Sequence, residues 1–231
     1  MISNISIHPK TMFKNALNIQ DFSFKSHTST AIIGTNGAGK STLINAILGI
    51  RSDYNFKAQN NNIPYHDNVI PQRKQLGVVS NLFNYPPGLN ANDLFKFYQF
   101  FHKNCTPNLF EKNLLNKTYE HLSDGQKQCL KIDLALSHHP QLIIMDELET
   151  SLEQKRSYIK SHKLAQHPTT YKHHRHSDPV VLDSYEWVLL LKNGNIAQYK
   201  PLNSILKSVA KTFNFKEKPT TKDLLALLKD I

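Results

Sequence analysis

The sequence predicts an α/β fold with a mixed sheet core, an N-terminal antiparallel β subdomain and a short helical subdomain. The glycine-rich stretch GTNGAGKST, residues 34–42, follows an apolar strand pattern and precedes apolar residues at helical spacing. From residue 122 onward, helical and strand patterns alternate, which is typical of a parallel sheet covered by helices. Within residues 1–33, apolar and polar side chains alternate instead, as they do in β-strands.

A chain of 231 residues is long enough for one domain with subdivisions. We predict a core at residues 1–80 and 119–200, a helical subdomain at 81–118 and a helical C-terminal tail at 201–231. In the tail, Thr221 is the predicted N-cap of a helix, for which docking on the domain's own core is favoured over binding a partner. The apolar residues that predict the helical subdomain are Leu94, Phe95, Phe97, Tyr98 and Phe101.

The composition indicates a basic protein without a disulfide framework. Its 28 Lys and Arg residues outnumber 18 acidic residues, for a formal net charge of +10. Such a balance suits nucleic acid, an anionic membrane surface or an acidic ligand, and does not choose among them. Cys105 and Cys129 have no metal-type spacing, so a reducing cytosol fits best. The longest apolar runs, 142–145 and 188–191, are far shorter than the about 20 residues that span a bilayer, so we expect a soluble protein.

The stretch at residues 34–42 has the residue types of a phosphate-binding loop. Glycines allow backbone N–H groups to converge on phosphate oxygens, and the following helix adds the positive end of its dipole. Lys40 would neutralise the β and γ phosphates, and the Ser41 hydroxyl would ligate Mg²⁺. The predicted binding residues here are Gly34, Asn36, Gly37, Ala38, Gly39, Lys40, Ser41 and Thr42.

Two further segments carry candidate chemistry. The apolar run LIIMDE, residues 142–147, ends in adjacent acids whose side chains point to opposite sides of a strand. Asp146 would therefore reach the metal, and Glu147 would poise a water against the γ-phosphate as general base. In LSDGQ, residues 122–126, Ser123 and Gln126 form a capping box at the start of a helix. This helix start is either a second anion-binding device or simply a well-started helix.

In this order, GTNGAGKST, LSDGQ and LIIMDE closely resemble the Walker A, signature and Walker B motifs of the ATP-binding-cassette (ABC) ATPases, a family of P-loop NTPases. The resemblance implies a single ABC ATPase domain, in which the predicted core binds ATP with Mg²⁺. It also implies a head-to-tail dimer of cassettes. Ser123 and Gly125 would contact the γ-phosphate bound to the other subunit, and Gln126 belongs to the same set.

The resemblance implies roles for three more residues. Phe13 is the best match to the aromatic residue that stacks on adenine, although a Phe before a strand also fits a core position. His176 matches the histidine that senses the γ-phosphate, with His174 as the alternative. Asn81 stands where the family has a catalytic-site glutamine, and its shorter side chain would reach Mg²⁺ or the attacking water less easily.

Other residues also depart from the family pattern. Asp124 replaces a glycine of the signature and brings a negative charge near a phosphate site. Leu148 replaces the proline that follows the Walker B glutamate. Together with Asn81, these departures favour a slow or asymmetric ATPase.

The main functional hypothesis is the ATP-binding and hydrolysing subunit of an ABC transporter. It would pair as a homodimer or heterodimer, drive a separate transmembrane permease and lie in the cytoplasm on the inner face of the cell membrane. The middle segment would contain the groove that receives the permease. Alternatively, its aromatic residues simply fill the core of the helical subdomain.

Two alternatives remain open at this point. One is a non-transport ABC ATPase, although the chain has neither a coiled-coil insertion nor a second cassette, and no nucleic-acid partner is expected. The other is a regulatory nucleotide-binding subunit that has lost hydrolysis, which the intact Lys40, Asp146 and Glu147 disfavour.

Overall fold

Backbone contacts divide the chain into two compact units, residues 1–69 with 171–231 and residues 70–170. The subdivision predicted from the sequence stays a prediction. A computed structural model describes residues 2–11, 16–25, 28–50, 53–60, 63–65, 76–80, 84–102, 105–107, 109–140, 142–146, 169–173, 185–213, 220–221 and 223.

Four strands of the first unit form an antiparallel sheet: β1 (Ile2–Pro9), β2 (Ile19–Phe22), β4 (Tyr54–Asn60) and β5 (Ile63–Tyr65). Their order is β2-β1-β4-β5, and each neighbouring pair is antiparallel. Ile5 and Ile7 of β1 are fully buried, as their alternating spacing predicts. The predicted antiparallel β subdomain is therefore confirmed.

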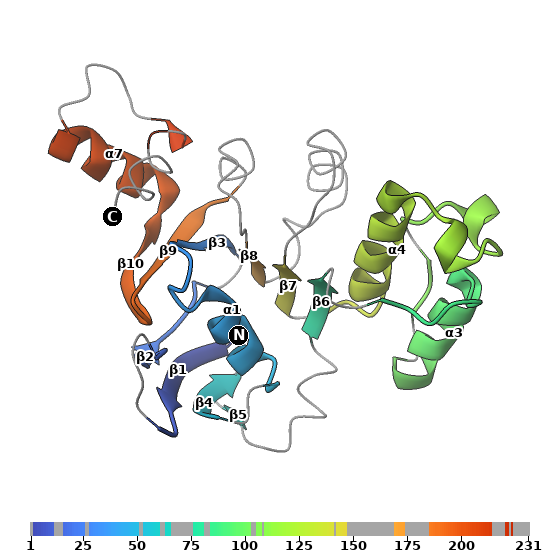
Figure 1. Cartoon of the computed structure of the whole chain (residues 1–231), viewed down its shortest axis with the longest axis horizontal. Coiled ribbons are helices and arrows are strands. Elements are labelled where there is room, and N and C mark those ends of the chain that lie inside the picture. The colour runs from blue at the N-terminus through green and yellow to red at the C-terminus, as the bar shows by residue number, and fades with distance from the viewer. Residues whose placement is uncertain are drawn as a thin grey trace. The chain divides into compact units, whose positions relative to one another are not determined.

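The first unit also contains strands of a mixed sheet and the helices α1 and α7. They are β3 (Thr28–Gly34), α1 (Lys40–Ile47), β8 (Thr169–His173), β9 (Trp187–Lys192), β10 (Asn195–Pro201) and α7 (Leu202–Phe213). The boundary between the two units falls within β8. β9 pairs parallel with β3 and antiparallel with β10, and β8 borders β3 on its other side. The mixed sheet predicted from the sequence is thus confirmed. Figure 1 shows β10 running directly into α7.

Helix α7 covers part of this mixed sheet. It contacts both β9 and β10, and its amphipathic sequence explains which side faces inward. The resulting cluster takes residues from β3, from β9, from a position two residues before β9, and from α7. It consists of Ala31, Ile33, Tyr185, Val188, Leu202, Ile205 and Leu206.

The second unit contains a parallel strand pair and a helical part. Its elements are β6 (Leu76–Ser80), α3 (Ala91–Phe101), the 3₁₀ turns η1 (Lys112–Leu114) and η2 (Tyr119–His121), α4 (Asp124–Leu136) and β7 (Leu142–Asp146). β6 pairs in parallel with β7, and α4 packs against β6. On the other side of α4, Leu130 and Leu134 share a core cluster with Leu94 and Phe95 of α3.

The aromatic residues of α3 do not all serve this core. Phe95 is buried, whereas Phe97, Phe100 and Phe101 are exposed by 61%, 84% and 47%. Their rings contact one another edge to face, in the pairs Phe97–Phe101 and Phe100–Phe101. The periodic pattern predicted the helix correctly, but core filling explains only part of its apolar side chains.

Side chains close the N-termini of α3 and α4, the α-helices of the second unit that the structure describes. In α3, Asn90 and Asp93 form a capping box, and in α4 Ser123 and Gln126 form the one predicted from the sequence. The expected cap at Thr221 is wrong by one residue. Thr220 exchanges capping hydrogen bonds with Asp223 instead, while Thr221 is buried.

Within the described part of the chain, no helix combines the length and the apolar character needed to cross a bilayer.

Candidate functional site

Residues 34–42, called here the phosphate loop, join the end of β3 to the start of α1. Gly37 and Gly39 have φ angles of 78° and 101°, a region that residues with a Cβ enter only with strain. A Cβ on Gly37 would meet no atom within 4 Å, so the space beside it is open. The loop thus presents its backbone without side-chain obstruction, which is the property that phosphate binding requires.

Lys40 reaches back over this loop from the first position of α1. Its side chain is largely buried, and its Nζ donates hydrogen bonds to the carbonyl oxygens of Gly34 and Thr35, each at 2.9 Å. These two hydrogen bonds hold the ammonium group at the loop. Ser41 is exposed on the adjacent position, and Thr42 is half-buried.

The N-terminus of α1 differs from those of α3 and α4. Its N-cap, Gly39, offers no side-chain hydrogen bond, and no acidic residue lies in its first turn, whereas α3 and α4 carry complete capping boxes. The first N–H groups of a helix have no partner within the helix. An anion at the loop would accept hydrogen bonds from these N–H groups, and the positive end of the helix dipole would stabilise its charge. The residues present therefore fit a phosphate.

A turn from the far end of the chain supports the phosphate loop. Gly194, in the turn between β9 and β10, donates from its N–H to the Ala38 carbonyl and accepts at its carbonyl from the Asn18 N–H. A Cβ on Gly34 would lie 2.4 Å from the Leu191 carbonyl oxygen. Glycine at position 34 is therefore needed for close packing against β9.

In the second unit, the Walker B strand β7 lies beside β6. Leu142 to Met145 are buried, and Asp146 pairs in register with Ser80 at the carboxyl end of β6. Asn81 and Glu147 directly follow these two strand ends in sequence. Both residues, and the side chain of Asp146, lie outside the described residues, so their predicted roles stay predictions.

The signature helix α4 begins as the sequence predicts. The Ser123 Oγ accepts from the Gln126 N–H at 3.3 Å, and the Gln126 Oε1 accepts from the Ser123 N–H at 3.0 Å. The Asp124 carboxylate is exposed and lies 3.9 Å from the Lys127 ammonium, an arrangement that contributes little in water. Gly125, which follows Asp124 in the sequence, is half-buried.

Several predicted site residues lie outside the described parts of the chain. They are Phe13, Asn81, Glu147, His174 and His176. β8 ends at His173, immediately before the two candidate sensor histidines. Their assignments remain predictions from the family resemblance.

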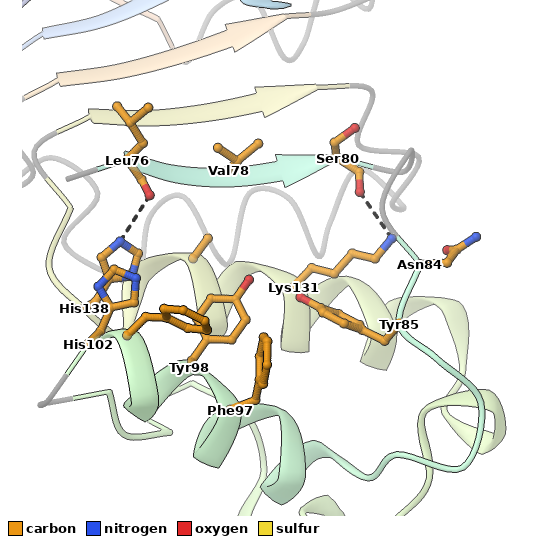
Figure 2. A pocket seen from close by; sticks show the side chains of 12 residues that line it. Leu76, Val78, Ser80, Asn84, Tyr85, Phe97, Tyr98, His102, Lys131 and His138 are labelled. Atoms are coloured by element: carbon orange, nitrogen blue, oxygen red, sulfur yellow. Dashed lines mark hydrogen bonds between the residues drawn. The ribbon is translucent and has the colours of Figure 1, made fainter. Parts of the chain in front are cut away.

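The second unit also holds a pocket of about 460 Å³ that sequence reasoning missed (Figure 2). It lies between β6, α3 and the α4 segment, and both ends of β6 contribute backbone contacts. The Leu76 carbonyl accepts from His138 Nε2 at 3.2 Å, and the Ser80 carbonyl accepts from Lys131 Nζ at 3.3 Å. The lining residues are Leu76, Val78, Ser80, Asn84, Tyr85, Phe97, Tyr98, Phe101, His102, Lys131, Ala135 and His138.

Burial shifts the pKa values of titratable groups around this pocket. Burial, followed by the nearby His102, lowers the pKa of His138 to about 4. The two imidazole rings stack with their centroids 4.0 Å apart. Burial, followed by the charge of Lys127, lowers the pKa of Lys131 as well. A lysine within the apolar face of the signature helix was the signal in the sequence that could have indicated this pocket.

The chain resembles known proteins along most of its length. A family profile described as ABC transporter matches residues 17–150, more than half of the 231-residue chain. A Streptococcus mutans protein named as an ABC transporter ATP-binding protein is 26% identical, over 89% of this chain and 88% of its own. The molybdenum import ATP-binding protein ModC of Saccharophagus degradans is 30% identical, over 77% of this chain and 53% of its own length.

A solved structure supports the same fold. The ATP-binding cassette MJ0796, in a dimeric post-hydrolysis state bound to ADP and Pi, superposes with a TM-score of 0.70 at 21% identity, over 87% of this chain and 99% of its own. The profile match spans the phosphate loop, the start of the signature helix and the Walker B strand. The chain therefore belongs to the ABC transporter family, with the fold of its ATP-binding P-loop ATPase cassettes.

Proposed function

We propose that this chain is the MgATP-hydrolysing subunit of a transporter and drives a separate membrane permease. The observation that carries the proposal is the uncapped N-terminus of α1, over which Lys40 is already held. A helix N-terminus without a side-chain cap and a positive charge lie together here, which is what a nucleotide phosphate requires. The names of the relatives, which are ATP-binding subunits of transporters, support the same function.

The proposed roles follow the motifs. Lys40 and the amides of the phosphate loop would bind the β and γ phosphates, and Phe13 would stack on the adenine. Ser41 and Asp146 would hold Mg²⁺, which when bound offsets the phosphate charge. Glu147 would accept a proton from the attacking water, assisted by Asn81 and by His176 as sensor of the γ-phosphate.

The proposed assembly is a head-to-tail pair of cassettes beneath a permease. Ser123, Gly125 and Gln126 of one subunit would complete the nucleotide site of the other, where the N-terminus of α4 adds a second dipole. The partner cassette is either a second copy or a related chain. The exposed aromatic surface of α3 would face the permease, and the protein would then lie on the cytoplasmic face of the membrane.

We further propose that hydrolysis is slow, or unequal between the two sites of the pair. The Asp124 carboxylate is exposed at the start of α4, so it would face the phosphates of the opposite subunit in the assembled pair. A negative charge at that position opposes phosphate binding through simple repulsion. The replacement Asp124→Gly should then raise the rate of phosphate release.

The deciding experiment is the mass in solution of the Glu147→Gln variant, measured by light scattering after size exclusion. With MgATP, the variant should shift from monomer to dimer, because bound nucleotide joins the two halves of each site and is not turned over. Without nucleotide, and with Lys40→Ala added, it should remain a monomer. The wild type should release phosphate at a rate that Glu147→Gln abolishes.

Other outcomes would redirect the proposal. A variant that binds nucleotide but stays monomeric would require a different cassette as its partner. Phosphate release that Glu147→Gln leaves unchanged would contradict the assigned chemistry. A wild-type protein that binds ATP but releases no phosphate, even with its permease, would be a regulatory subunit.

A further inference from the structure

The phosphate loop is supported by two residues that directly precede β2. The Leu17 side chain lies against the loop, since a Cβ on Gly39 would be 3.1 Å from Leu17 Cδ1. The Asn18 N–H donates to the Gly194 carbonyl at 2.8 Å, and the Gly194 N–H donates to the Ala38 carbonyl at 3.1 Å. Leu17 and Asn18 therefore support the loop both directly and through the turn at Gly194.

Tyr54, the first residue of β4, holds the backbone of Leu17. Its hydroxyl accepts a hydrogen bond from the Leu17 N–H at 3.2 Å. Both residues are buried, with exposed fractions of 6% and 1%. A buried backbone N–H that loses its acceptor is costly, because water does not replace the lost partner. Packing alone would be served equally well by phenylalanine, so the hydroxyl of Tyr54 has a specific task at Leu17.

His8 of β1 holds Asn18, the next residue along the chain. The His8 Nδ1 lies 2.8 Å from Asn18 Oδ1, and the imidazole is the donor because an amide oxygen only accepts. β1 pairs with both β2 and β4, so His8 and Tyr54 lie on neighbouring strands. Two side chains of the antiparallel sheet thus hold two successive residues beside the phosphate loop.

The phosphate loop needs such support because glycines make its backbone permissive. Gly37 and Gly39 have positive φ angles, and glycine loses more conformational freedom on ordering than any other residue. A loop that fluctuates binds phosphate more weakly, since binding must then also order the loop. The contacts of Leu17 and Gly194 limit this freedom and preorganise the N–H groups of the loop.

We propose that Tyr54 and His8 are positioning residues for the nucleotide phosphates and act on the phosphate loop through Leu17, Asn18 and Gly194. The inference rests on the proposed function and adds two residues that sequence motifs do not indicate. Because both residues act on the loop and not on the base, their replacement should weaken a nucleotide and its inorganic counterpart alike.

The first test needs no nucleotide. Hydrogen–deuterium exchange of the full-length protein, read by mass spectrometry, reports how readily the backbone N–H groups of residues 34–42 open. Tyr54→Phe should speed exchange in this peptide about 5-fold, the effect of one lost hydrogen bond. His8→Leu should also speed it, whereas His8→Asn retains an N–H donor near the position of Nδ1 and should preserve more of the protection.

Tyr199→Phe is the matched control for Tyr54→Phe. The Tyr199 hydroxyl also accepts from a backbone N–H, that of Lys25, at 2.8 Å. Lys25 precedes the start of β3, whereas the phosphate loop follows its end. Tyr199→Phe should therefore leave exchange in residues 34–42 unchanged, even where it lowers the melting temperature as much as Tyr54→Phe does. Equal exchange of this peptide in the two variants would overturn the inference.

The second test is calorimetric titration with MgADP, which is not hydrolysed, and with magnesium pyrophosphate, which has no base. Tyr54→Phe should weaken the binding of both ligands about 5-fold, and Tyr199→Phe should weaken neither. A loss confined to MgADP would place the effect on the base and contradict the inference. A wild type that binds neither ligand would contradict the proposed function, while the exchange measurement would still decide whether Tyr54 and His8 hold the loop.

Discussion

Lys40 contributes to the phosphate loop in two ways. Its hydrogen bonds to the carbonyls of Gly34 and Thr35 fix the loop, and its charge would attract the phosphates in the proposed function. Because the side chain is largely buried, both functions depend on its length and on the compact ammonium group.

We therefore expect Lys40→Ala to weaken ATP binding at least about 10-fold, since a lost charged hydrogen bond costs about 1.5–3 kcal/mol. Lys40→Arg should not restore binding, because a planar guanidinium does not fit the buried path. Titration with a fluorescent ATP analogue measures both effects. Lys200→Ala, at an exposed position of β10, is the control, and wild-type affinity in Lys40→Arg would contradict this account.

His138 should make stability depend on pH. Burial lowers its pKa from 6.5 in the unfolded chain to about 4 in the folded protein. As the pH falls below about 6.5, the unfolded state gains a proton that the folded state does not take up until about pH 4. This histidine therefore reduces stability progressively between those pH values, and its effect is constant below them.

The measurement is the melting temperature between pH 7 and about pH 4. His138→Gln should flatten the decline across this range, whatever its effect on the absolute melting temperature. His121→Gln, at an exposed position of η2, serves as the comparison and should keep the wild-type slope. Equal slopes in all three proteins would show that His138 is not the group responsible.

At the scale of elements, β6 and α4 pack unusually closely at Gly77. A Cβ on this residue would lie 2.5 Å from the Ala135 carbonyl oxygen and 2.9 Å from Pro140 Cγ. Two backbone segments meet here, so neither can yield by a change of rotamer. The wall of the pocket is held in place by this contact.

Gly77→Ala should lower the free energy of unfolding by about 2–3 kcal/mol, the cost of forcing a methyl group into a packed contact. Gly88→Ala, which has a φ of 83° and open space around it, should cost about 1 kcal/mol through backbone strain alone. Urea unfolding of the two variants compares these costs. The account fails if Gly77→Ala proves the milder change.

The elements associated with motifs could be predicted directly, whereas the sequence offered only one signal for the pocket, the lysine within the apolar face of α4. Glycines and capping residues act over a few positions, so their spacing indicates the phosphate loop and the start of α4 directly. The periodicity of α3 predicts a helix, but its apolar stripe is wider than the face that packs, so Phe97 and Phe101 could not be assigned to core or surface. Likewise, Lys131 reaches Ser80 only through packing between distant segments.

At the scale of the whole molecule, the formal net charge of +10 should produce weak attraction to anionic membranes. We expect part of the protein to sediment with phosphatidylserine vesicles at about 50 mM salt and to be released at about 500 mM, because the screening length falls severalfold. Neutral phosphatidylcholine vesicles should bind little at either concentration. Binding that persists at high salt would instead indicate apolar insertion, for which Phe100→Ser is the diagnostic variant.

The contact between Gly194 and the phosphate loop also has a consequence for the synthesis of the protein. The loop is translated early, yet the turn that donates to Ala38 and the β9 carbonyl that packs on Gly34 are translated near the end. A nascent chain folds from its N-terminus as it emerges from the ribosome. We therefore expect the phosphate loop to reach its final form only after residue 194 has left the ribosome.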